Sequence, residues 1–146
     1  MIPIGDDGRG RSLTPLINWL LLLLNLGVFI YQLTLPMFEL ERFVFEYGAV
    51  PADLSAILES PSTAQLSTLT TVFTSMFMHG GIAHFLGNML FLWVFGDNIE
   101  DAMGHIGYLM FYLAGGVAAS AAHVVVDPSS TIPMIGASGA ISAVMG

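Results

Sequence analysis

The sequence PLINWLLLLLNLGVFIYQLTL fills residues 15–35 and decides the class of this protein. About 20 mostly apolar residues are enough for an α-helix to cross the hydrocarbon core of a membrane. Pro15 suits the first turn of such a helix, and Pro36 closes its far end. Arg9 and Arg11 precede the segment as in a signal peptide, but the run is long and no small-residue cleavage site follows it. We therefore expect a retained transmembrane helix.

Two further apolar stretches, residues 80–95 and 106–126, also qualify as membrane spans. The second of these is rich in Gly, Ala and Ser, which let helices approach closely in lipid and favour a central place in a bundle. A fourth helix begins near Ser138, and the residues up to Gly146 are too few to cross about 30 Å of hydrocarbon. We expect an all-α, polytopic transmembrane helix bundle with three complete spans and the start of a fourth, as a piece of a longer protein.

The composition of the 146 residues supports a chain that resides in a lipid bilayer. Hydrophobic residues make up 55% and charged residues only 10%, whereas about 25% are charged in an ordinary soluble domain. Three Lys and Arg residues against 11 Asp and Glu give a net charge of -8, which excludes nucleic-acid binding and a polybasic lipid anchor. The absence of cysteine excludes disulfides, thiolate chemistry and a Cys-based zinc site.

The distribution of cations predicts the orientation in the membrane. Arg9 and Arg11 lie just before the first span, and Lys and Arg favour the cytoplasmic side. We therefore expect residues 1–13 to form a short cytoplasmic N-terminal tail and residues 14–146 to form a partial membrane domain. The lack of Cys and the brief tail favour a prokaryotic plasma membrane. The oligomeric state is not given by the sequence.

A long connection, residues 36–75, separates the first two spans. Its first part alternates apolar residues with acidic ones, which favours a loop lying in the membrane interface. Its second part, residues 55–71, is rich in Ser and Thr and is expected to form turns and a short helix.

Polar side chains inside the second span are the first candidate functional residues. His84 and Asn88 are four residues apart and lie on one helical face, while His79 lies at or just before the helix start. Ionisable groups within spans are costly and suggest function. The plainer alternative is that His and Asn form hydrogen bonds between helices. A zinc site is disfavoured because the third His or carboxylate of catalytic zinc is missing.

A second candidate lies where the fourth helix begins, at Gly136-Ala137-Ser138-Gly139. The glycines leave space around the hydroxyl of Ser138, and unpaired N–H groups at a helix start favour the negative charge of an oxyanion. The alternative is a helix-packing motif of small residues. The hydrolase elbow G-x-S-x-G is nearly matched, but Ala140 replaces its second Gly and no strand is expected before it.

Alternation of the spans places the starts of the second and fourth helices at the same membrane face. At 1.5 Å per residue, Asn88 lies roughly 10 Å below the start of its helix. The hydroxyl of Ser138, the imidazole of His84 and the amide of Asn88 are therefore expected to converge in one cavity.

These residues together resemble the rhomboid intramembrane serine proteases. The resemblance rests on His79-x4-His84-x3-Asn88 in a second helix, on the Ser138 motif that opens a fourth, and on Gly96-x3-Glu100-x3-Gly104 at the turn between helices two and three. It covers the chain from about Thr14 onward and includes the long first loop and the small-residue third helix.

The resemblance implies a role for each matched residue. Ser138 is implied to be the nucleophile that attacks a peptide carbonyl, with His84 and Asn88 as oxyanion-hole donors beside the backbone N–H of Ser138. Gly136 and Gly139 are implied to keep the turn open. His79 is implied to be a polar position near the cavity, and Glu100 and Gly104 are implied to be structural.

Two departures from the family pattern concern the general base. The family's base is a histidine on a sixth helix, which these 146 residues do not reach. His105 and His123 lie on other segments, and a serine hydroxyl is a weak nucleophile without a base. We therefore expect the piece alone to be inactive. Ser142 also stands where many members carry a tyrosine stacked on the base, and others a small residue.

The resulting expectation is an intramembrane serine endopeptidase with a Ser-His dyad. Its substrate is expected to be the transmembrane segment of another membrane protein, and no metal or organic cofactor is implied. Two alternatives remain, a catalytically inactive rhomboid-like protein that binds transmembrane clients and a fragment of a transporter. Covalent labelling of Ser138 distinguishes the protease from both.

Overall fold

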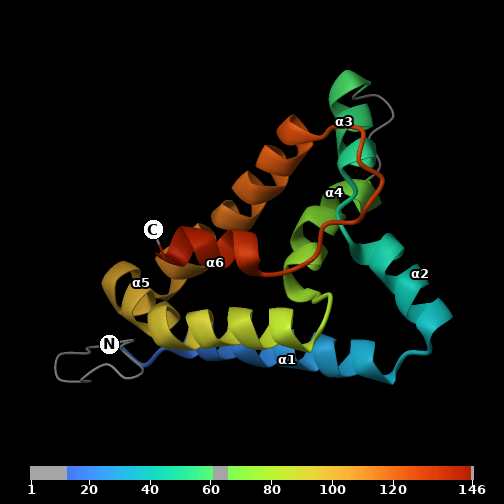
Figure 1. The fold of residues 1–146 in the computed structure, drawn as a ribbon. Helices are drawn as coiled ribbons and strands as arrows, with labels where there is room; N and C mark the ends of the chain where they lie inside the picture. The colour runs from blue at the N-terminus through green and yellow to red at the C-terminus, as the bar shows by residue number, and fades with distance from the viewer. Residues whose placement is uncertain (1–12, 61–65, 146) are drawn as a thin grey trace.

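The computed structural model describes residues 13–60 and 66–145, and its regular elements are all helical (Figure 1). The elements follow in this order: α1 (Leu16–Thr34), α2 (Met37–Tyr47), α3 (Pro51–Glu59), α4 (Leu66–Thr74), the short 3-10 helix η2 (Ser75–Phe77), α5 (Ile82–Val126) and α6 (Ser138–Met145). Most of the predicted cytoplasmic tail lies outside the described residues.

Helix α1 confirms the first predicted apolar helix almost to the residue. Its outer face carries exposed leucines, such as Leu23 at 65% and Leu33 at 62% exposure. Its inner face is unexpectedly polar, because Asn18, Asn25 and Gln32 are all buried. These three residues are spaced by seven, which returns them to the same side of a helix.

The second and third predicted apolar helices are the two arms of α5, which meet at Gly104, where the backbone is not helical. Gly104 has φ 75° and ψ 165°, a backbone conformation that a residue without a Cβ adopts readily. The first arm, before Gly104, runs beside α1, and the second arm rises away from it (Figure 1). Among the described residues, α1 and α5 are the two helices long and apolar enough to cross a membrane.

The connection between α1 and α5 is more ordered than its sequence predicts. It contains α2, α3 and α4. The short helix expected within residues 55–71 is present as α4, and the last residues of α3 add helical structure that was not expected there. Ser and Thr side chains in α4 bond to carbonyls of their own helix, which satisfies their hydroxyl groups within it. Thr70 and Thr71 donate to the carbonyls of Ser67 and Thr68, each at 2.7 Å.

Helix α6 begins at Ser138, as predicted, and packs on α5. Its buried face consists of Ala140, Ile141 and Val144, which are at most 4% exposed. This face joins a core that also contains Tyr108 and Tyr112 of α5. Helices α5 and α6 approach each other closely because Gly115 of α5 has no side chain. A Cβ on Gly115 would lie 2.6 Å from the Cβ of Ala143 in α6.

The bend of α5 is tied to the start of α1 by a buried carboxylate. Glu100 is fully buried, and its two oxygens accept hydrogen bonds from the backbone N–H groups of Ile17 (2.9 Å) and Asn18 (2.7 Å). These N–H groups belong to the first turn of α1, where no intrahelical acceptor exists and negative charge is favoured. His105 contacts the same carboxylate through its Nδ1.

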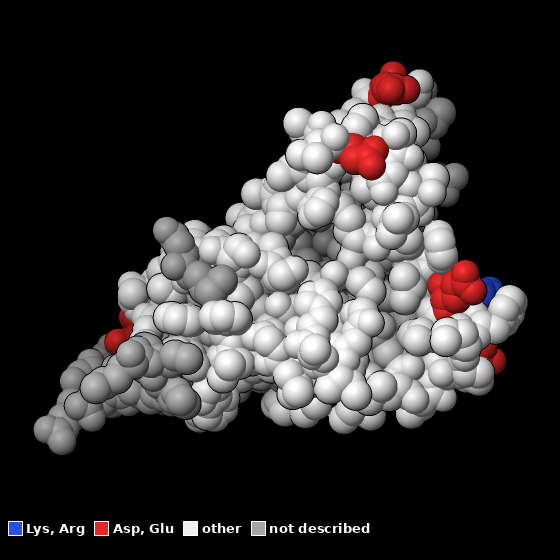
Figure 2. Space-filling model, in the orientation of Figure 1, with Lys and Arg blue, Asp and Glu red and all other residues white. Residues whose placement is uncertain are grey.

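On one face of the molecule, charged side chains lie away from the middle (Figure 2). On the face in Figure 2, acidic and basic residues lie near its outer ends, and the broad area between them carries none. Such a distribution is typical of a protein whose middle contacts lipid, because charge inside hydrocarbon is costly.

Candidate active site

The segment before Ser138 is held by backbone hydrogen bonds from two distant parts of the chain. Ala49 and Met134 exchange a pair of bonds, from N–H to carbonyl, at 3.2 and 2.8 Å. The N–H of Gly136 donates to the carbonyl of Ser75 at 2.9 Å. The turn that presents Ser138 is therefore fixed before α6 begins.

Gly136 separates the hydroxyl of Ser138 from the imidazole of His84. A Cβ on Gly136 would lie 2.5 Å from Cε1 of His84 and 3.5 Å from Oγ of Ser138. The φ of Gly136 is 124°, a region that side-chain-bearing residues rarely adopt. Two groups 54 positions apart in the sequence thus flank one glycine.

Asn88 lies one turn after His84 on the first arm of α5 and is 6% exposed. Its Nδ2 has no hydrogen-bond partner among the described residues. A buried amide N–H without a partner is rare, because losing water without gaining a partner is costly. Asn88 therefore offers a free donor on the helix that carries His84.

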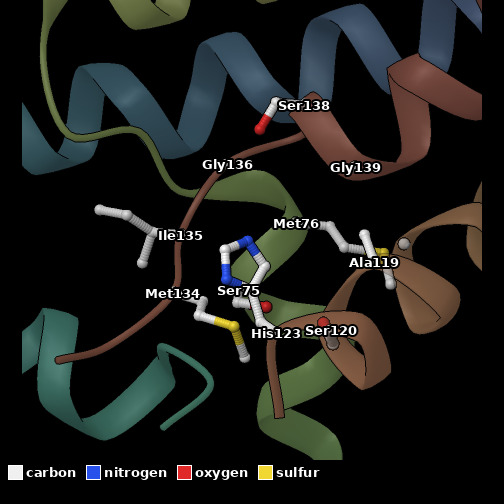
Figure 3. A pocket seen from close by; sticks show the side chains of 11 residues that line it. Ser75, Met76, Ala119, Ser120, His123, Met134, Ile135, Gly136, Ser138 and Gly139 are labelled. Atoms are coloured by element: carbon white, nitrogen blue, oxygen red, sulfur yellow. The ribbon is translucent and has the colours of Figure 1, made fainter. Parts of the chain in front are cut away.

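A cavity of about 80 Å³ opens on Ser138 (Figure 3). Four parts of the chain line it: η2, the second arm of α5, the segment before α6 and the start of α6. The lining residues are Ser75, Met76, Gly116, Ala119, Ser120, His123, Met134, Ile135, Gly136, Ser138 and Gly139. A water molecule requires roughly 10–15 Å³ of such space. The cavity can therefore hold several waters beside the Ser138 hydroxyl.

Gly139 faces the second arm of α5, where a Cβ on it would lie 2.3 Å from the Cβ of Ala119. Of the two remaining histidines, His123 lines the cavity and His105 contacts Glu100 at the bend. Glu100 and Gly104 lie at that bend, at the far end of the arm from His84.

His79 lies just before α5 and is 3% exposed. Its ring packs edge-on against Phe29 (6.1 Å between centroids), Phe85 (5.2 Å) and His84 (5.4 Å). Burial lowers the pKa of His79 to about 4, and the neighbouring His84 adds to the effect.

Acidification from about pH 6.5 to about pH 4 is expected to lower the free energy of unfolding. Unfolded histidine takes up its proton near pH 6.5, whereas folded His79 stays neutral until about pH 4. The unfolded state therefore binds more protons between about pH 4 and pH 6.5. The contribution of neutral His79 to the free energy of unfolding is present in full only above about pH 6.5. Unfolding measured in detergent across this range is expected to show a flatter pH dependence for His79→Phe, and equal slopes in the two proteins contradict the prediction.

Three buried polar residues of α1 were missed by the sequence reasoning. Asn18 accepts a hydrogen bond from the hydroxyl of Tyr108 at 2.9 Å, Asn25 donates to the carbonyl of Leu21 at 2.7 Å, and Gln32 bonds to the backbone of His79. The available signal was their seven-residue spacing within an apolar segment.

Comparison with known proteins gives consistent matches. The rhomboid domain family matches residues 66–146. The chain is 41% identical over 73 residues to "Rhomboid protease GluP" of Bacillus subtilis (strain 168), which covers 50% of this chain and 14% of that protein. It is 36% identical over 94 residues to "RHOMBOID-like protein 12, mitochondrial" of Arabidopsis thaliana (53% and 28%) and 34% identical over 95 residues to "Rhomboid-related protein 2" of Mus musculus (63% and 31%).

The chain thus matches less than a third of the length of each of these relatives. No solved structure gives a significant match to it. The family match covers more than half of the chain and includes the helices that carry His84 and Ser138. The chain therefore belongs to the rhomboid family.

Proposed function

We propose that the protein containing this chain is an intramembrane serine endopeptidase with Ser138 as its nucleophile. The observation that carries the proposal is the placement of His84 and Ser138 on either side of Gly136, where one added carbon would touch both. The hydroxyl attacks the peptide carbonyl, and the histidine that accepts its proton lies outside these 146 residues. The rhomboid match and the protease among the relatives support the same reaction.

The negative charge that develops on the carbonyl oxygen needs donors that are already in place. His84 offers a ring N–H, Asn88 offers an Nδ2 group without a partner, and Ser138 offers its backbone N–H at the start of α6. The helix start favours negative charge at this point. Gly136 and Gly139 are proposed to keep the turn open for the substrate.

The substrate is proposed to be a transmembrane segment of another membrane protein. A helical segment hides its carbonyls in backbone hydrogen bonds, so it must unwind locally before attack. The cavity beside Ser138 supports the second half of the reaction, because hydrolysis of the acyl-enzyme needs water at that hydroxyl. In this proposal α1 and the two arms of α5 cross the membrane separately, with the N-terminus in the cytoplasm.

Full-length protein in detergent is expected to be labelled covalently by a fluorophosphonate at Ser138, and Ser138→Ala is expected to abolish labelling. Ser142→Ala is the matched control, since Ser142 lies one turn later on the same helix and donates to the carbonyl of Ser138. His84→Ala and Asn88→Ala are expected to slow labelling by roughly 10²–10³, the loss typical of one oxyanion donor. Equal labelling of wild type and Ser138→Ala, or none of either, contradicts the protease and leaves a client-binding or transport protein.

A further inference from the structure

The carboxamide of Gln32 forms a reciprocal pair of hydrogen bonds with the backbone of His79. Its Oε1 accepts from the N–H of His79 at 3.0 Å, and its Nε2 donates to the carbonyl of the same residue at 3.2 Å. Both partners are buried, with Gln32 and His79 each 3% exposed. The side chain thus satisfies both backbone groups of one residue, as a neighbouring β-strand would.

This pair holds the segment between η2 and α5, which contains two glycines, Gly80 and Gly81. Glycine leaves the backbone many conformations, so external contacts must select one. The ring of His79 adds a second constraint, because it packs against Phe29 of α1 and Phe85 of α5, which stack on each other at 4.3 Å. Gln32 and Phe29 therefore fix His79 from the same helix.

The constraint extends from His79 to the candidate active site. The ring of His79 lies 5.4 Å from the ring of His84, and the ring of His84 lies against Gly136. A change in the path of the segment before α5 therefore moves His84, the group beside Ser138. The hydrogen bonds of the Gln32 side chain within the described residues go to the backbone of His79, so its influence on Ser138 passes through His79 and His84.

We propose that Gln32 is a positioning residue, which places the His84 imidazole beside Ser138 by clamping the backbone of His79. The inference rests on the proposed function for its effect on catalysis. The placement of His84 is a separate, structural consequence that can be measured without any activity.

The test compares Gln32→Leu and Gln32→Glu with Asn25→Leu in the full-length protein. Asn25 is the matched control, because it is a buried amide on the same face of α1 whose Nδ2 donates to the carbonyl of Leu21 and not to the backbone of His79. Gln32→Glu keeps the shape of the side chain and its acceptor oxygen but loses the N–H donor when it is ionised. This variant keeps the test informative if Gln32→Leu fails to fold.

Fluorophosphonate labelling is measured as a function of probe concentration, which separates the maximal rate from the probe affinity. Gln32→Leu is expected to lower the maximal rate by roughly 10²-fold with little change in affinity, since misplacing a catalytic group by about 1 Å can cost that much. Gln32→Glu is expected to show a smaller loss, and Asn25→Leu to label at the wild-type rate. Equal rates in the Gln32 and Asn25 variants overturn the proposal.

Histidine ring resonances, assigned by NMR on protein with labelled histidine, provide the readout that needs no activity. The resonances of His84 are expected to shift in both Gln32 variants and to stay unchanged in Asn25→Leu. Unchanged His84 resonances in the Gln32 variants overturn the positioning role, even where wild type is labelled. If wild type is not labelled at Ser138 while the resonances shift, the proposed function fails and the positioning of His84 stands.

Discussion

Replacing Gly136 with alanine is expected to abolish labelling and turnover at Ser138, with a loss of at least about 10²-fold. The new Cβ would lie 2.5 Å from Cε1 and 2.7 Å from Nε2 of His84, closer than atoms in contact can approach. The φ of 124° is also strained for alanine, so the turn cannot simply keep its shape. Relief requires movement of His84 or of the turn, and either change separates the imidazole from the hydroxyl.

Gly87→Ala is the matched control for this prediction. Gly87 lies on the same arm of α5 as His84, and a Cβ on it meets nothing within 4 Å. It is expected to label at the wild-type rate and to be slightly more stable, because alanine is the better helix former by up to about 1 kcal/mol. Wild-type labelling of Gly136→Ala contradicts the close packing of His84 on this turn.

Replacing Glu100 with glutamine is expected to lower the free energy of unfolding by about 2–4 kcal/mol, from the loss of two buried, charge-assisted hydrogen bonds. Each carboxylate oxygen accepts one N–H group from the first turn of α1. Glutamine has one oxygen and one NH₂ group, so one of the donors, Ile17 or Asn18, faces another donor. The negative charge that favours this helix start is also lost.

Unfolding of the full-length protein in mixed micelles measures this loss. Glu46→Gln applies the same chemical change to an exposed residue, whose contact with Arg42 is 3.9 Å long. Surface pairs of this kind are worth at most about 1 kcal/mol, so this variant is expected to unfold nearly like wild type. Similar stabilities for the Glu100 and Glu46 variants contradict the role of Glu100 at the start of α1.

The parts of the fold with an unambiguous sequence signal were predictable. The bounds of α1 follow from an uninterrupted apolar segment between two prolines, and the start of α6 follows from small residues after Pro133. The two arms of α5 were predicted as separate helices, but the sharpness of the turn between them was not predictable. Gly104 turns the chain within a single residue, while the sequence there reads as a polar loop between two helices.

The members of the candidate site were chosen from the sequence and stay a prediction. The expectation that all three line one cavity is not met, because Ser138 lines the cavity while His84 and Asn88 are not among its lining residues. His84, Asn88 and Ser138 stand out because each is polar within an apolar surrounding. Ser75 carries no such signal, since its contribution is a backbone carbonyl that accepts from Gly136. Backbone contacts of this kind depend on the path of the chain and not on residue type. Gln32 was missed for a different reason, because its partner is the main chain of a residue 47 positions away.

The polar residues along α1 have a consequence for how the bundle can move. Hydrogen bonds join α1 to α5 through Asn18 and Tyr108 near one end, and join α1 to the residue ahead of α5 through Gln32 and His79 near the other. A slide by even one residue, about 1.5 Å, would break the bonds at both ends at once. Helix α1 therefore cannot slide along its axis or rotate about it while these bonds are kept. Any displacement of α1 relative to α5 therefore requires both sets of bonds to break first.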